Sequence, residues 1–215
     1  TALFATVLLV SNVASTKLVV LGPFTFDGGT LLFPLAYIFG DVLTEVYGYR
    51  KSRRVIWIGF FALLLATLTF QAVAHLPAPP DAESQRFGEA FGLLLGLTPR
   101  IVLGSLLAYF LGEFANAYVL AKLKVRTEGR FFWLRALAST LVGQGLDTGV
   151  FLLVAFYGVF PKEVLLAVFL SNYAFKLGVE ALMLPFTYAV VGFLKRAEGM
   201  DAYDRDTDFN PFRLT

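Results

Sequence analysis

Six long apolar runs constrain the fold of this chain more than any other feature of its sequence. They occupy residues 1–21, 29–48, 54–75, 100–121, 131–158 and 163–194. A helix needs about 20 mostly apolar residues to cross the hydrocarbon core of a bilayer. The chain is 57% hydrophobic and 16% charged, whereas soluble domains average about 45–50% apolar and about 25% charged. We therefore predict an all-α integral membrane protein, with one domain of six transmembrane helices over residues 1–196 and a cytoplasmic tail over residues 197–215.

The distribution of Lys and Arg predicts the orientation of these helices. Thirteen of these residues lie in the tail, or in or just beyond the loops that follow the second and fourth runs. Three lie in the other loops, namely Arg86, Arg100 and Lys162. Because positively charged loops stay on the cytoplasmic side, both termini are expected in the cytoplasm, as an even number of crossings requires.

The connection over residues 76–99 is the least regular part of the chain. It begins with Pro77, Pro79 and Pro80 and becomes apolar at Phe91–Leu97. Two interpretations stay open at this stage. One is an outer loop with a short interfacial or re-entrant segment, and the other is an ordinary loop.

The composition excludes several classes of protein. The chain has no Cys and one His, which excludes a disulfide framework, thiol chemistry and His/Cys metal sites, so we expect no metal and no cofactor. It has no Gly-Lys pair and no Gly-x-Ser-x-Gly sequence, and therefore neither a P-loop nor a hydrolase nucleophile elbow. The net charge of +2 is too small to indicate a nucleic-acid partner.

Polar side chains inside the predicted spans are the candidate functional residues. They are Asn12, Lys17, Asp41, Glu45, Glu113, Asn116, Gln144, Asp147, Asn172, Lys176 and Glu180. A charge at the bilayer centre costs about 2.5–3.5 kcal/mol on insertion scales, so such residues face a cavity or one another. Many of them recur at i,i+3 or i,i+4 spacing, which places them on one face of a helix. We predict a substrate pocket near the membrane midplane, where transporters hold their substrates.

The charge balance of this group restricts what can occupy the pocket. Five acids face two lysines, and burial of like charges disfavours ionisation, so some acids are expected to be protonated. Alternatively, a cation or a ligand rich in N–H donors completes the pocket. A carboxylate accepts two parallel N–H bonds, which suits the amidine-like edge of a purine, and a protonatable acid equally suits a coupling proton. The simpler interpretation is that these side chains only hold the helices together.

Two similar segments indicate a degenerate internal repeat. Residues 35–41 read Leu-Ala-Tyr-Ile-Phe-Gly-Asp, and residues 107–113 read Leu-Ala-Tyr-Phe-Leu-Gly-Glu. Both end in a glycine followed by an acid. Transporters often contain such repeats, with the binding site between the copies, although chance similarity is common in apolar sequence.

Several motifs resemble those of the queuosine precursor transporter family, also called the vitamin uptake transporter family. The most specific is Pro34–Tyr49, which reads Pro-Leu-Ala-Tyr-Ile-Phe-Gly-Asp-Val-Leu-Thr-Glu-Val-Tyr-Gly-Tyr. The others are Gly112–Tyr118, Ser139–Thr148, Asn172–Lys176 and Asp201–Phe212. The resemblance implies a six-helix protein of the bacterial inner membrane that imports 7-cyano-7-deazaguanine and 7-aminomethyl-7-deazaguanine, precursors of a tRNA modification. A pocket carboxylate would then hold the N–H donors of the base, and Lys176 or a pocket amide would meet its O6.

Two other functions are compatible with the sequence. A six-helix chain of this length also resembles the substrate-binding subunit of an energy-coupling-factor vitamin importer, which works with a separate coupling protein and ATPases. Asp41 and Asp147 are candidates for an intramembrane aspartyl protease dyad, in which two acids share a proton. The predicted spans contain neither the Tyr-Asp nor the Gly-x-Gly-Asp motif of those enzymes, which disfavours the protease. The energy source and the oligomeric state stay open.

Overall fold

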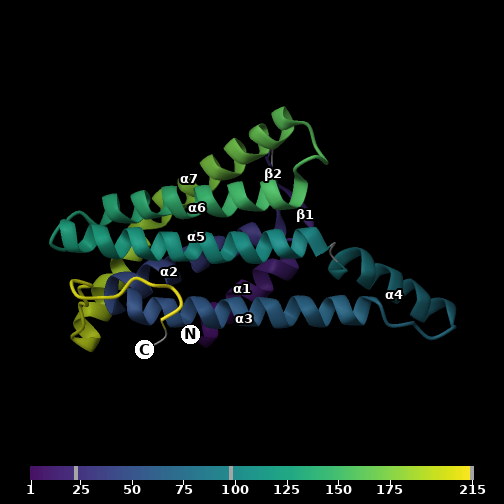
Figure 1. The fold of residues 1–215 in the computed structure, drawn as a ribbon, viewed down its shortest axis with the longest axis horizontal. Coiled ribbons are helices and arrows are strands. Elements are labelled where there is room, and N and C mark those ends of the chain that lie inside the picture. The colour runs from purple at the N-terminus through teal and green to yellow at the C-terminus, as the bar shows by residue number, and fades with distance from the viewer. Residues whose placement is uncertain (22–23, 97–98, 214–215) are drawn as a thin grey trace.

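The computed structural model describes residues 1–21, 24–96 and 99–213, and it is a bundle of helices (Figure 1). The α-helices of the described part are α1 (Ala2–Ala14), α2 (Phe33–Tyr47), α3 (Tyr49–Ala74), α4 (Ala82–Leu95), α5 (Pro99–Arg126), α6 (Phe132–Phe156) and α7 (Lys162–Glu198). Between α1 and α2 lie the strands β1 (Leu18–Leu21) and β2 (Phe24–Asp27) and the 3-10 helix η1 (Gly28–Leu31). The predicted all-α architecture is confirmed, apart from this small hairpin.

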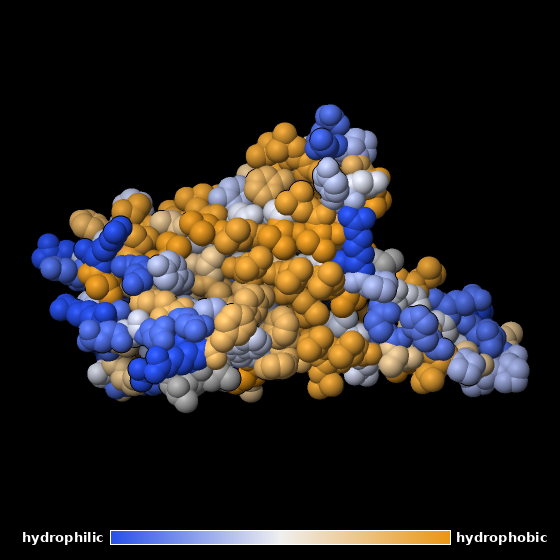
Figure 2. Space-filling view, viewed as in Figure 1, coloured by the Kyte–Doolittle hydropathy of each residue, from blue (hydrophilic) through white to orange (hydrophobic). Residues whose placement is uncertain are grey.

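Four helices are long and apolar enough to cross a membrane, judged by length and composition over the described residues. They are α3, α5, α6 and α7, with 26, 28, 25 and 37 residues. The remaining two predicted crossings correspond to α1, with 13 residues, and α2, with 15. Figure 2 shows apolar residues over the middle of the bundle and polar residues gathered at its ends.

The prediction of one helix over residues 1–21 is wrong beyond Ala14. Helix α1 ends there, and Leu18–Leu21 pairs in antiparallel register with Phe24–Asp27. The physical reason is local: Thr16 and Lys17 interrupt the apolar run, and the Leu-Val-Val-Leu that follows is rich in β-branched residues, which favour strands. Ser11 fixes α1 to this region, because its hydroxyl donates to the Gly29 carbonyl at 3.1 Å.

The connection between α3 and α5 contains a helix and is not an ordinary loop. Helix α4 begins after Asp81, whose carboxylate accepts a hydrogen bond from the Ser84 N–H at 2.8 Å, a typical N-cap. It extends beyond the end of α3 (Figure 1). Its contact with α3 includes Phe91, whose ring centroid lies 6.3 Å from that of Phe70.

Helices α5 and α6 pack with their backbones in contact. A Cβ on Gly112 would lie 2.8 Å from the Asp147 Cβ and 3.0 Å from the Gly143 carbonyl oxygen, and a Cβ on Gly143 would lie 2.7 Å from the Asn116 Cβ. Only glycine permits this approach, as at many transmembrane helix contacts. The close contact brings the polar residues of α5 and α6 onto one another.

A Gly112→Val substitution is expected to lower the melting temperature of the detergent-solubilised protein. Overpacking of a tight contact typically costs about 1–3 kcal/mol, because the two helices must separate. The matched control is Gly178→Val on α7, since a Cβ on Gly178 has no atom within 4 Å. Equal melting temperatures for the two variants would contradict the close packing of α5 on α6.

Candidate functional site

A polar cluster, buried at Asp41 and Glu180 and half-buried elsewhere, joins α2, α5, α6 and α7 in the middle of the bundle. It contains Asp41, Glu113, Asn116, Asp147, Lys176 and Glu180, which are linked to one another by hydrogen bonds, an ion pair and charge–charge interactions. Gln144 lies one turn before Asp147 on α6. The structure thus brings together most of the residues that the sequence indicated.

Asp41 is at the centre of one half of this cluster. Its side chain is 1% exposed, and its Oδ1 accepts a hydrogen bond from Asn116 Nδ2 at 3.2 Å. The carboxyl group of Glu180, on α7, faces it and is 2% exposed. Glu113 approaches from α5 and interacts electrostatically with Asp41. Three acids from three helices therefore meet within the bundle.

An ion pair forms the other half. Lys176 Nζ on α7 donates to Asp147 Oδ2 on α6 at 2.8 Å, and lies 3.4 Å from the Thr148 hydroxyl. Glu113 interacts with both charges of this pair. Because Asp41 faces Glu180 while Asp147 pairs with Lys176, the aspartyl dyad considered from the sequence is not formed.

Several acceptors of the cluster have no donor. Asp41 Oδ2, Asn116 Oδ1 and Gln144 Oε1 are buried, and none has a hydrogen-bond partner among the described residues. An unpaired buried polar atom costs about 1–3 kcal/mol, and buried polar groups are paired in most proteins. The two unpaired amide oxygens, those of Asn116 and Gln144, are in a cluster that also holds carboxylates and so suit a ligand carrying N–H donors.

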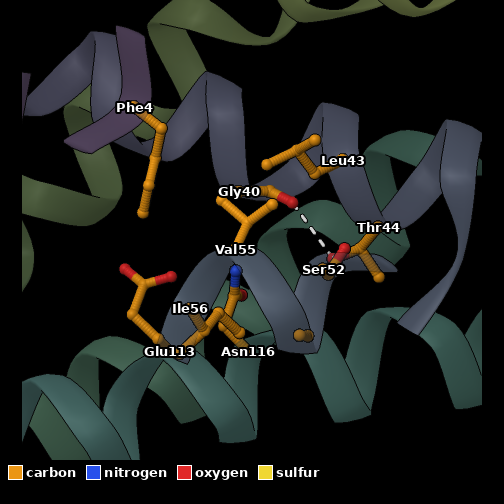
Figure 3. Close-up of a pocket in the computed structure, with 10 residues that line it drawn as sticks. Phe4, Gly40, Leu43, Thr44, Ser52, Val55, Ile56, Glu113 and Asn116 are labelled. Carbon is orange, nitrogen blue, oxygen red and sulfur yellow. Dashed lines mark hydrogen bonds between the residues drawn. The ribbon is translucent and has the colours of Figure 1, made fainter. Parts of the chain in front are cut away.

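A small cavity adjoins the cluster between α2, α3 and α5 (Figure 3). Glu113 and Asn116 point from α5 toward Gly40 on α2, where a Cβ would lie 3.7 Å from Glu113 Oε2, an ordinary contact. On the other side, Thr44 donates to the Gly40 carbonyl at 3.0 Å and lies 3.0 Å from the Ser52 hydroxyl. The cavity volume is about 10 Å³, which is room for about one water molecule. The cavity beside Glu113 and Asn116 is therefore too small for a base in this conformation.

Three of the predicted site residues lie apart from this cluster. Asn12, Lys17 and Asn172 are all exposed. Asn12 lines an apolar groove of about 130 Å³ between α1, α3 and α4, and its amide donates to the Leu8 carbonyl at 3.4 Å. Lys17 lies outside α1, because that helix ends at Ala14.

Glu45 also lies apart, in a second cluster near the α2–α3 turn. Its carboxylate accepts hydrogen bonds from Arg135 at 2.6 and 3.2 Å and from Lys195 at 2.7 Å. Lys124 Nζ is 3.7 Å away, and both lysines also form ion pairs with Asp201. Burial alone raises the pKa of Asp201, but the hydrogen bonds from Lys124 and Lys195 outweigh it and lower that pKa below its ordinary value. We call these five residues the Glu45 ion cluster.

Sequence reasoning treated the cations of this cluster as loop charges that set the orientation. Arg135 is 0% exposed and Lys124 is 1% exposed, so both hold the bundle together. One signal was present in the sequence. Arg135 lies inside the fifth apolar run, where an unpaired arginine is costly, and this position implies an acidic partner.

The tail after α7 is folded onto the same end of the bundle (Figure 1). The Tyr49 N–H donates to Asp204 at 2.9 Å, and Gly48, with φ at 81°, leaves space for that carboxylate. Arg53 donates to the Asp208 carbonyl at 2.9 Å, and the Trp57 indole donates to the Pro211 carbonyl at 2.7 Å. The α2–α3 turn, the α5–α6 turn and the tail therefore share one end.

Long apolar helices around an ion-paired acidic site define a multi-pass membrane protein, and comparison with known proteins gives its family. The family described as "Putative vitamin uptake transporter" matches residues 27–190. The chain belongs to this family of membrane transporters, as its motifs indicated, and is a transporter rather than an enzyme.

Three named relatives are similar to most of the chain. The "Probable queuosine precursor transporter" of Bacillus subtilis (strain 168) is 36% identical over 188 residues, which cover 86% of this chain and 80% of the relative. The "Queuosine precursor transporter" of Escherichia coli (strain K12) is 27% identical over 76% of this chain and 71% of its own length. The "Probable queuosine precursor transporter" of Haemophilus influenzae (strain ATCC 51907 / DSM 11121 / KW20 / Rd) is 26% identical over 76% and 67%. No solved structure matches the chain significantly.

Proposed function

We propose that this transporter imports the queuosine precursors 7-cyano-7-deazaguanine and 7-aminomethyl-7-deazaguanine through the central polar cluster. The observation that carries the proposal is the pair of unpaired amide acceptors, Asn116 Oδ1 and Gln144 Oε1, in the cluster that holds the Glu113 carboxylate. The relatives, which are named as queuosine precursor transporters, support the same cargo.

The chemistry of a 7-deazaguanine complements this cluster. Its N1–H and exocyclic amine form a donor edge that a carboxylate accepts in two parallel bonds, and we assign this role to Glu113. Its O6 needs a donor, which Lys176 or the Asn116 amide supplies. The aminomethyl form also carries a positive charge, which offsets the acidic excess of the cluster.

Import requires the helices to move, because the cavity holds about one water molecule. We propose alternating access, in which α2 and α7 separate from each other as they move against α5 and α6 to admit the base. Pro185 lies inside α7, and a proline inside a helix removes a backbone hydrogen bond and permits a bend. We also propose that the excess of acids carries a coupling proton.

The orientation in the membrane is a further part of the proposal. We propose six crossings in the bacterial inner membrane, two of them made by α1 with its hairpin and by α2, with both termini cytoplasmic. The basic α2–α3 and α5–α6 turns and the tail lie at one end, which supports this orientation. The two repeated segments end at Asp41 and Glu113, which interact across the site, and this supports the internal repeat.

The direct test is ligand-induced thermal stabilisation of the purified protein in detergent. A ligand that binds only the folded state raises the melting temperature as its concentration exceeds Kd. We expect stabilisation by the two 7-deazaguanines and none by adenine, riboflavin or biotin, with guanine as the closest competitor. Stabilisation by riboflavin or biotin, and not by either 7-deazaguanine, would show that the protein carries a different cargo. Uptake by the protein alone in liposomes would exclude dependence on an energy-coupling-factor partner, whereas binding without uptake would favour that alternative.

A further inference from the structure

Two buried carboxyl groups face each other across the α2–α7 contact. They belong to Asp41 and Glu180, which are 1% and 2% exposed. Neither forms an ion pair with any residue in the described part of the chain. The nearest lysine along α7, Lys176, is paired with Asp147. The two acids therefore neutralise no cation of the protein.

The other polar groups around Asp41 do not change this balance. From α5, Asn116 donates one hydrogen bond to Oδ1, and Glu113 adds a further carboxyl group. From α6, the Asp147 carboxylate is already neutralised by Lys176. The α3 side of the adjoining cavity contributes the Ser52 hydroxyl, which is engaged with Thr44. The one cation among these groups is Lys176, which is paired with Asp147.

Two carboxylates in contact, buried and without a cation, cannot both stay ionised, because their repulsion in a dry interior is large. One proton between them removes the repulsion and turns the contact into a hydrogen bond, as in aspartic protease dyads. Asp41 Oδ2 is buried and lacks a donor in the described chain, and a proton shared with Glu180 supplies one. The geometry is that of a proton-binding site.

We infer that the Asp41–Glu180 pair binds the proton that drives import, separately from the Glu113 and Lys176 groups that hold the base. This inference rests on the proposed transport function. The pair joins α2 to α7, so its separation when these helices move exposes two carboxylates to solvent and releases the proton. Opened toward the outer side, the pair takes up a proton; closed, it holds the proton; and opened toward the inner side, it delivers the proton to the cytoplasm, one proton for each base.

The experiment uses purified protein in liposomes with 7-cyano-7-deazaguanine. An inward gradient of two pH units is expected to drive accumulation of the base, with an upper limit of about 100-fold for one proton per base, because each pH unit corresponds to a factor of ten. The vesicle interior starts at the higher pH. A pH-sensitive dye inside it is expected to report a fall in pH as the base enters with its proton. An inward Na⁺ gradient at equal pH is expected to drive no accumulation, and accumulation by Na⁺ alone would overturn the proton assignment.

The Asp41→Asn variant separates the proton site from base binding. Its amide donates a hydrogen bond to Glu180 and so imitates the protonated pair, which preserves the fold. We expect exchange of labelled for unlabelled base at equal pH to stay within about threefold of the wild type, the size of an effect below about 1 kcal/mol. We expect accumulation driven by the pH gradient to be lost. The matched control is Asp206→Asn, at an exposed acid of the tail.

The outcomes distinguish this inference from the proposed function. Absence of base exchange in the wild type would refute the transport proposal itself. Exchange without proton-driven accumulation, or undiminished accumulation by Asp41→Asn, would refute the proton site and leave transport standing. Infrared spectroscopy tests the site without substrate: a protonated-carboxyl C=O band at neutral pH is expected in the wild type and is expected to be weaker in Asp41→Asn. A band of unchanged intensity in that variant would overturn the inference.

Discussion

The Arg135→Gln variant is expected to accumulate poorly in membranes and to have the lowest melting temperature among single substitutions outside the central site. Arg135 is fully buried and makes two hydrogen bonds to the Glu45 carboxylate. It also donates to the Gly129 and Arg130 carbonyls and so closes the α5–α6 turn. Removing one member of a buried ion pair typically costs about 3–5 kcal/mol, a large part of the roughly 5–15 kcal/mol that stabilises a typical domain.

Two further variants test whether the loss arises from the Glu45 ion cluster. Arg130→Gln changes an exposed arginine of the same turn, and a surface change of this kind is expected to stay within about 0.5 kcal/mol. Adding Glu45→Gln to Arg135→Gln removes the unpaired buried acid and is expected to restore part of the loss, since neighbouring residues are not additive. An Arg135→Gln protein as stable as the Arg130→Gln protein would show that the cluster does not hold the bundle.

The long helices were predictable because length and hydropathy alone specify them. The same measure failed at Leu18–Leu21, since an apolar run of four has no resolvable period and reads equally as helix or strand. It also overestimated the length of α1, because the polar interruption at Thr16 and Lys17 was absorbed into a window of about 20 residues. Helix α4 was only partly foreseen, since its first half is mostly polar and its apolar residues gather toward its end.

The central site was largely predictable because its residues carry charge where charge is costly. The spacing of Lys176 and Glu180, and of Glu113 and Asn116, predicted shared faces, and the structure places all four in the cluster. Glu45 is also four residues from Asp41 but lies one turn nearer the helix end. Its partners there are cations of α5, α6 and α7. Spacing along one helix does not reveal which helix packs against each turn.

The docked tail was not predictable for a different reason. Three of its bonds to the bundle use the tail's own main-chain carbonyls: the side chains of Tyr49, Arg53 and Trp57 donate to the carbonyls of Phe209, Asp208 and Pro211. Every residue has such a carbonyl, so the sequence contains no mark of these bonds. The polar composition of residues 197–215 correctly excluded a further span, but it did not distinguish a free segment from one folded onto α3.

A Glu113→Gln substitution is expected to raise the Kd for 7-cyano-7-deazaguanine about 10- to 100-fold and to reduce uptake correspondingly. A hydrogen bond to a charged group contributes about 1.5–3 kcal/mol, and every 1.4 kcal/mol changes the affinity tenfold. Glutamine keeps the shape of the side chain, but its NH₂ group replaces one of the two carboxylate oxygens. That NH₂ group faces the N–H donors of the base and cannot accept from them. Because the change removes one acid from an acid-rich site, the free protein is expected to stay folded, so a lost response reports binding rather than unfolding.

The matched control for this variant is Glu163→Gln, at an exposed acid in the first turn of α7, which is expected to bind the base as the wild type does. Unchanged affinity in Glu113→Gln, with loss of affinity in Asp147→Asn, would move the base-binding role to the other side of the α5–α6 contact. The two carboxylates differ as binding groups. Asp147 is already neutralised by Lys176, whereas Glu113 adjoins the cavity and forms no ion pair in the described chain. A base that needs a free carboxylate is therefore expected to select Glu113, and the size of the effect at that position measures how much of the affinity comes from charge.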